Sequence, residues 1–145
     1  MRFIVDSNVL FTFFWKDSVF RKILLKQKLI LFSPDYALEE INKYSEEITV
    51  KAKISKHEFK KSLAELLIFV EFIHLKEYLP FIKDAGLLAE NLSNEEKQEF
   101  LLDIDFSALA ISLNCSLWSN DSILKKQQKV NVFSTKEIIE LIGSL

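Results

Sequence analysis

The chain has 145 residues, of which 49% are hydrophobic and 28% charged, and its formal net charge is -2. This length suits one domain with one core, and this composition excludes an intrinsically disordered chain. The small negative charge argues against a protein that grips nucleic acid only by neutralising phosphates, but not against a site where metal ions supply the positive charge. We therefore expect residues 1–145 to form a single domain.

Cellular location is indicated by two features of the sequence. Cys115 is the only cysteine, so no disulfide can form within the chain, which fits a reducing cytoplasm. The apolar start, residues 1–15, is interrupted by Asp6 and lacks the basic leader and cleavage site of a signal peptide. No apolar run approaches the roughly 20 residues that span a bilayer. We expect a cytoplasmic protein without membrane contact.

The first half of the chain alternates between strand and helix patterns. Residues 2–5 form a short β-prone run that ends before Asp6, residues 8–27 have a helical pattern, and residues 29–33 form a second strand closed by Pro34. Helices are predicted over residues 35–46 and, with clear amphipathic spacing, over residues 56–69. Residues 70–75 are either a third strand or a continuation of that helix.

The second half continues the alternation. Pro80 is predicted to open a helix that runs through Leu92, and residues 93–96 resemble the start of another. Residues 104–114 form an apolar, buried helix, followed by a strand at 115–119 and a short helix after Asp121. A strand at 130–134 and a last helix over residues 137–145, to which Thr135 and Lys136 lead, complete the chain.

This order of elements predicts an α/β fold, in which a parallel sheet is covered by helices on both faces. Right-handed crossovers place the carboxyl ends of all strands along one edge, where ligand sites of such sheets lie. Acidic residues stand at or soon after these strand ends, or at a helix start that faces the same crevice: Asp6, Glu39, Glu40, Asp103, Asp105 and Asp121.

Such an acidic group indicates bound cations. Gathering several carboxylates costs several kcal/mol in repulsion and desolvation, which cations offset. Carboxylates and waters are the ligands of Mg²⁺ and Mn²⁺, and these ions activate water for in-line attack on a phosphodiester. His57, His74 and Cys115 are too few for a structural zinc site. Alternatively, each acid taken separately is a helix cap or first-turn acid, and residues 6–8 and 119–121 are both good capping sequences.

Three segments resemble the PIN-domain nucleases, a family that includes VapC-type toxins. They are FIVDSNVL (3–10), SPDYALEEI (33–41) and DIDFSALAISLNCSLWSND (103–121). They occur in the family's order, over essentially the whole chain. In the second segment the family's Glu precedes an aliphatic residue, which selects Glu40 over Glu39. The spacing of the third segment favours Asp103 over Asp105 and puts Ser119 in the family's Thr/Ser position.

The resemblance implies a three-layer α/β/α sandwich around a central parallel sheet. It also implies a Mg²⁺- or Mn²⁺-dependent endoribonuclease that acts on RNA and forms a homodimer. Many family members are the toxin half of a toxin–antitoxin pair, so a cognate antitoxin protein is an implied partner. The chain departs from the family in its acidic net charge and in residues 71–100, which match only in helical character.

Each site residue has an implied role. The four catalytic acids, which would also bind the metal, are Asp6, Glu40, Asp103 and Asp121. Asp105 is either an outer metal ligand, which would orient a metal-bound water, or a solvated first-turn acid. Ser7 and Ser119 either fix carboxylates or cap helices, and Asn8 would hold Asp6 in place.

No substrate-binding residue is assigned. The basic candidates near the expected edge are Lys16, Arg21, Lys125 and Lys126, although charged helix faces are usually only solvated. Trp15 and Trp118 are candidates for stacking on bases, with core packing the favoured role for Trp118.

Three other functions are open to such a sequence. A non-catalytic PIN-like protein that binds RNA or a partner would lack one of the acids, whereas all four are present. A phosphatase with an aspartate nucleophile needs a D-x-D loop after the first strand, but here Ser7 and Asn8 follow Asp6. A receiver-like signalling domain needs an acceptor Asp in mid-chain and a Lys after a late strand, and neither stands in a convincing place.

Overall fold

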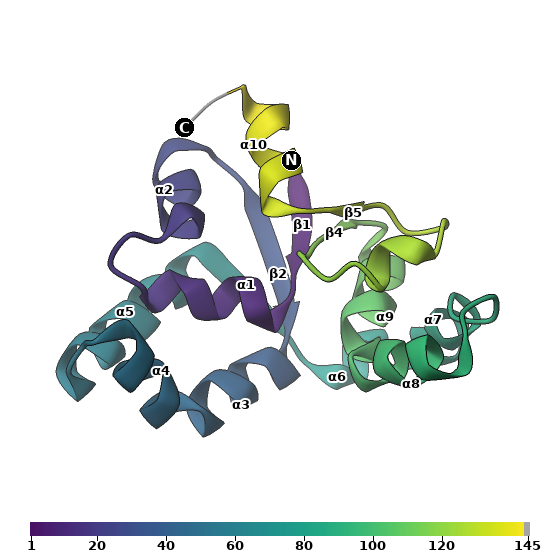
Figure 1. Cartoon of the computed structure of the whole chain (residues 1–145), viewed down its shortest axis with the longest axis horizontal. Helices are drawn as coiled ribbons and strands as arrows, with labels where there is room; N and C mark the ends of the chain where they lie inside the picture. Colours follow the sequence, from purple (N-terminus) through teal and green to yellow (C-terminus); the bar gives the residue numbers. More distant parts are fainter. Residues whose placement is uncertain (144–145) are drawn as a thin grey trace.

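The structure is a computed structural model that describes residues 1–143. Within them, five parallel strands form one sheet in the order β3-β2-β1-β4-β5 (Figure 1). The strands are β1 (Arg2–Val5), β2 (Ile30–Pro34), β3 (Val70–Ile73), β4 (Ser116–Trp118) and β5 (Val132–Phe133). Each predicted strand is present, and residues 70–73 are confirmed as a strand, not an extension of the preceding helix.

Helices connect and cover these strands. The α-helices are α1 (Ser7–Phe11), α2 (Val19–Lys26), α3 (Asp35–Lys43), α4 (Ser45–Ala52), α5 (Lys56–Phe69), α6 (Leu75–Tyr78), α7 (Ile82–Leu87), α8 (Asn94–Leu102), α9 (Ile104–Leu113) and α10 (Thr135–Ile142). Short 3₁₀ segments are η1 (Thr12–Phe14), η2 (Leu79–Phe81) and η3 (Leu124–Lys126). The predicted final helix is confirmed through Ile142, and its last two residues, 144–145, lie outside the described residues.

The sheet separates two helical layers, as the α/β/α prediction requires. Figure 1 shows α1 and α2 on one side of the sheet and α9 on the other. On the first face, Trp118 of β4 packs edge-on against Phe20 of α2, with ring centroids 4.9 Å apart, and Phe3 of β1 lies beside Trp118. On the opposite side α9, whose sequence is almost entirely apolar, packs against β1, β2 and β4. The three-layer fold is therefore confirmed.

The predicted helix over residues 8–27 is wrong as a single element. The chain tightens into η1 after Phe11, which brings Phe13 and Phe14 into the core, and then turns before α2. Ser18 starts α2 anew, because its hydroxyl accepts a hydrogen bond from the Arg21 amide at 3.1 Å. The long apolar run predicted one continuous helix, but the helix is interrupted where Phe13 and Phe14 pack into the core.

Two further helix boundaries differ from the prediction. The helix predicted over residues 35–46 ends at Lys43, and α4, which was not predicted, follows directly and ends at Lys53 in the left-handed conformation (φ 57°). Pro80 lies in the first turn of the 3₁₀ segment η2, which leads into α7, and α7 ends at Leu87, short of the predicted Leu92; α6, which was not predicted, begins earlier, after His74. The side chain of His74 starts α6 by accepting a hydrogen bond from the Lys76 amide at 3.1 Å.

The burial of β1 yields a stability prediction with a matched control. Ile4 is fully buried in the central strand, whereas Ile30 of the neighbouring strand is 55% exposed. Ile4→Ala should lower the free energy of unfolding by roughly 2–5 kcal/mol, because it leaves a cavity in the core. Ile30→Ala should cost less than about 1 kcal/mol. Urea unfolding of both variants checks this, and equal losses would contradict the placement of β1 at the centre of the core.

Candidate metal centre

Asp6 lies at the carboxyl end of the central strand. Its amide donates to the Trp118 carbonyl at 3.1 Å, which extends the β1–β4 ladder by one residue. Its carboxylate accepts one hydrogen bond from the Val9 amide at 3.1 Å, as the N-cap of α1, and another from the Ser119 hydroxyl. Asp6 is therefore held by both its own helix and the end of β4.

Asp121 lies in the turn after β4 and is connected to Asp6 through Ser119. The Ser119 hydroxyl oxygen accepts a hydrogen bond from the Asp121 amide at 3.0 Å while it donates to Asp6. The Asp121 carboxylate itself accepts from the Ile123 amide at 2.9 Å and remains exposed. A single buried serine thus sets the position of two of the predicted acids.

Glu40 reaches the same edge from α3. The Ser7 hydroxyl donates a hydrogen bond of 2.6 Å to its Oε1 atom, across 33 residues of sequence. Ser7 itself is buried. Ser7 and Ser119 therefore both bind carboxylates, while the cap of α1 is Asp6. Asn8 is exposed, and its backbone amide, not its side chain, contacts the Asp6 carboxylate.

Asp103 lies at the junction of α8 and α9, where its side chain makes no helix-capping hydrogen bond. Burial raises its pKa from 3.8 to about 6, and negative charge on four neighbours adds to the effect: Glu40, Asp6, Asp121 and Asp105, in decreasing order. The predicted acids therefore lie within each other's electric field at one edge of the sheet.

The pKa of Asp6 is raised as well, and burial is again the main cause. The charge of Asp121 adds to this rise, while hydrogen bonds from the Ser119 hydroxyl and the Val9 and Asn8 amides oppose it. The protein thus stabilises the Asp6 carboxylate with donors and destabilises it by desolvation, an arrangement that a cation would relieve.

Two tyrosines near the acids were missed by the sequence analysis. Tyr78, almost fully buried, donates a hydrogen bond of 2.6 Å to Asp105. Burial, then this bond, raise the pKa of the Tyr78 phenol. Tyr36 on α3 is 38% exposed, and its pKa is raised by burial and then by Glu40, Asp103 and Asp105. The spacing of four from Tyr36 to Glu40 puts them on one helix face, whereas no local signal marks Tyr78.

The donor set suits a hard divalent cation. All its side chains are carboxylates, the ligands that Mg²⁺ and Mn²⁺ prefer, and their mutual repulsion is the term that a bound cation offsets. In residues 1–143, no three Asp, Glu, His or Cys side chains converge closely enough to hold an ion by themselves. Ions of this type keep several of their waters, so a site that is completed by water fits the observed spacing.

Most of the basic and aromatic candidates for substrate contact are engaged elsewhere. Arg21 donates to the Phe13 carbonyl at 2.7 Å and its guanidinium lies over the Phe13 ring. Lys125 pairs with Glu137, and Lys126 with Glu96. Trp118 is fully buried, and its Nε1 donates a hydrogen bond to the Thr135 hydroxyl oxygen at 3.0 Å. Lys16 and Trp15 remain exposed.

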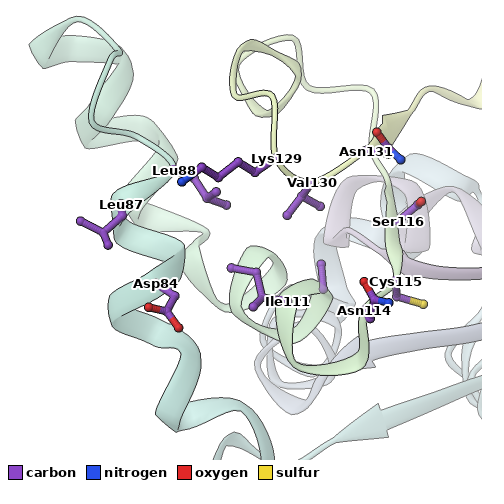
Figure 2. Close-up of a pocket in the computed structure, with 11 residues that line it drawn as sticks. Asp84, Leu87, Leu88, Ile111, Asn114, Cys115, Ser116, Lys129, Val130 and Asn131 are labelled. Atoms are coloured by element: carbon purple, nitrogen blue, oxygen red, sulfur yellow. The ribbon is translucent and has the colours of Figure 1, made fainter.

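A separate cavity of about 520 Å³ lies at the other edge of the sheet. Figure 2 shows it between α7, the end of α9 and the segment that leads into β5, with Asp84 on one wall and Lys129 reaching across. Cys115 and Ser116, at the start of β4, also line it. Because parallel strands begin at the edge opposite to the one where they end, this cavity is remote from the acids.

The fold and site together define an α/β/α protein with an open parallel sheet and an acidic carboxyl edge. The chain belongs to the PIN domain family, whose model matches residues 4–138. Members of this family are generally nucleases that use divalent metals.

Comparison with solved structures finds the same fold. A chain in the crystal structure of VapBC2 from Rickettsia felis bound to a DNA fragment from their promoter aligns with a TM-score of 0.62 and 18% identity, covering 92% of this chain and 98% of that chain. Among curated proteins, none matches significantly. No helix of the described residues has the length and apolar character needed to cross a membrane.

The raised pKa of Asp103 predicts how stability depends on pH in the metal-free protein. The folded state holds this proton more tightly than the unfolded chain, so stability is lost as pH rises from about 4 through about 6. In EDTA, Asp103→Asn should therefore stabilise the protein at pH 7.5 by roughly 1–2 kcal/mol, a figure reduced for solvent screening of a half-buried group. At pH 4 the gain should vanish.

Urea unfolding at the two pH values measures this effect. Asp84→Asn, which changes an exposed acid on α7, is the matched control and should change stability little at either pH. A gain for Asp103→Asn of the same size at pH 4 and pH 7.5 would show that charge repulsion is not its cause.

Proposed function

We propose that this chain is a divalent-metal-dependent endoribonuclease, formed by residues 1–145 as one domain and acting with Mg²⁺ or Mn²⁺. The observation that carries the proposal is the meeting of acids from four separate segments at the carboxyl edge of a PIN-family sheet, where burial and then the charges of these neighbours raise the pKa of Asp103. If no cation bound there, the repulsion among these carboxylates would only destabilise the fold.

The site residues divide into ligands and supports. Asp6, Glu40, Asp103 and Asp121 would hold one or two ions, with Asp105 as an outer acid that Tyr78 holds by its hydrogen bond. Bound there, Mg²⁺ or Mn²⁺ would lower the pKa of a coordinated water and offset the charge that develops on the phosphodiester.

The chain's own hydroxyls orient this set. Ser119 binds one oxygen of Asp6, and the Val9 amide binds the other, so the carboxylate plane cannot rotate freely. The Ser7 hydroxyl holds Glu40 at one oxygen, Oε1. Such supports hold ligands in place before an ion arrives and reduce the entropy lost on binding.

We propose an antitoxin protein as partner, a homodimer as the assembly and the cytoplasm as the location. The fold shared with a chain of the VapBC2 complex supports the first of these. The alternative function is a weak or inactive PIN-like module that binds RNA or protein. This alternative needs no ion at the acids, of which no three converge closely enough within the described residues to hold one without water.

The test is an RNA-cleavage assay in Mn²⁺, in Mg²⁺ and in EDTA, with the wild type and Asp6→Asn. The wild type should cleave only with an added cation, and Asp6→Asn should cleave at least about 100-fold more slowly, since it removes a ligand that the protein holds at both oxygens. Asp84→Asn should cleave like the wild type.

The outcomes separate the two functions. Cleavage that survives both EDTA and Asp6→Asn would rule out the metal mechanism. RNA that binds to the wild type but stays intact in every cation would favour the non-catalytic module.

A further inference from the structure

A second cavity, also of about 520 Å³, adjoins one of the four acids, Glu40. Its wall includes Glu40, which Ser7 holds, and Asn8, whose amide contacts the Asp6 carboxylate. The cavity therefore opens beside the candidate metal centre, unlike the one in Figure 2, and its size is in the range of roughly 300–1,000 Å³ typical of small-molecule sites.

Aromatic rings form much of this cavity. Trp15 is 45% exposed, yet its backbone is fixed: its amide donates to Thr12 at 3.2 Å and its carbonyl accepts from Ser18 at 3.3 Å. Phe11 and Tyr44 pack edge to face, with ring centroids 6.5 Å apart at 80°. Trp15 therefore presents a flat apolar ring at a fixed place beside the cavity.

The polar groups of the cavity discriminate between ligands. Glu40 and Glu47 contribute two carboxylates, and Lys51 contributes one ammonium group. A phosphate would meet net negative charge here and be repelled. A neutral, planar ring with N–H donors would instead find acceptors on the carboxylates and on the Asn8 side chain, and flat faces on the aromatic rings.

We propose that this cavity binds an unpaired base of single-stranded RNA next to the scissile phosphate, with Trp15 stacking on the base. The inference rests on the proposed ribonuclease function and adds to it a specificity subsite. Stacking between bases and aromatic side chains is the usual means of gripping single strands. The carboxylates favour bases that carry an amino group, which are adenine, guanine and cytosine, over uracil.

The fluorescence of Trp15 reports whether a ligand occupies the cavity. The chain has two tryptophans, and the other, Trp118, is fully buried in the core. Quenching of exposed tryptophan fluorescence by a ligand therefore arises at Trp15. This signal needs neither cleavage nor a metal ion, so it can be recorded in EDTA.

The experiment titrates the full chain in EDTA with four probes: a single-stranded RNA hexamer rich in adenine, a uridine hexamer, an abasic hexamer of the same charge, and a short arginine-rich peptide. The RNA hexamer should quench Trp15 and the abasic strand should not. A uridine hexamer should bind several-fold more weakly than the adenine hexamer. Equal quenching by the abasic strand would overturn the proposal, as would quenching by the peptide alone, which would assign the cavity to a protein partner.

Variants locate the effect. Trp15→Ala should weaken binding of the adenine hexamer by roughly tenfold or more, measured by anisotropy of a labelled strand, and Trp15→Phe should restore most of it. Leu25→Ala, which removes another exposed apolar side chain, from α2, should bind like the wild type. Unfolding in urea confirms that each variant is folded.

The two proposals fail differently. If the wild type cleaves RNA with Mn²⁺ but Trp15→Ala binds and cleaves equally well, the base subsite is wrong and the nuclease stands. If the base-dependent quenching is present but no cation supports cleavage, the nuclease is wrong, and the cavity is a base-binding site of a non-catalytic protein.

Discussion

Repulsion among carboxylates at one edge of a parallel sheet is the constraint on which the rest of this structure depends. Parallel strands end together, so residues that follow β1 and β4 meet although more than a hundred positions separate them in sequence. Burial, and then the charges of the neighbouring acids, raise the pKa of Asp103 to about 6. The fold limits the cost by giving Asp6, Glu40 and Asp105 a hydroxyl donor each. Neutral donors lower the energy of a carboxylate without removing its charge, which leaves the charge available to a cation.

The apolar core makes that geometry rigid. Trp118 ends β4 inside the core, against Phe20 and Phe3, and the next residue is Ser119, which holds Asp6. The indole nitrogen of Trp118 is itself bonded to Thr135 at the start of α10. A shift of β4 would therefore have to move a buried indole before it moved the serine. In this way the energy of core packing fixes the position of groups that repel one another.

The sequence predicted those features of the fold that depend on local residue patterns and on the order of the strands. The bounds of α5 were correct because Ser55 and Glu58 form a capping box before a regular apolar face. Asp6 and Asp121 could be placed near one edge because they follow strands, and Asp103 because it starts a helix, whereas Glu40, inside α3, was selected by the family resemblance. The break before Ser18 and the bond from Tyr78 to Asp105 were not, because both result from packing between distant segments. For the same reason Lys125 looked free in the sequence, whereas in the structure it pairs with Glu137.

The acidic composition of the chain then becomes consistent with a nucleic-acid substrate. Arg21 is bound to the Phe13 carbonyl, and the two lysines of η3 are paired with glutamates, so these side chains are not directed toward a phosphate. Attraction to phosphates then has to come from cations held by the acids. Further binding of the strand has to come from contacts that need no charge. An exposed Trp15 beside Glu40 supplies such a contact. Stacking needs no charge, so this cavity would select the strand by its bases, while the salt dependence of binding would come from its phosphates.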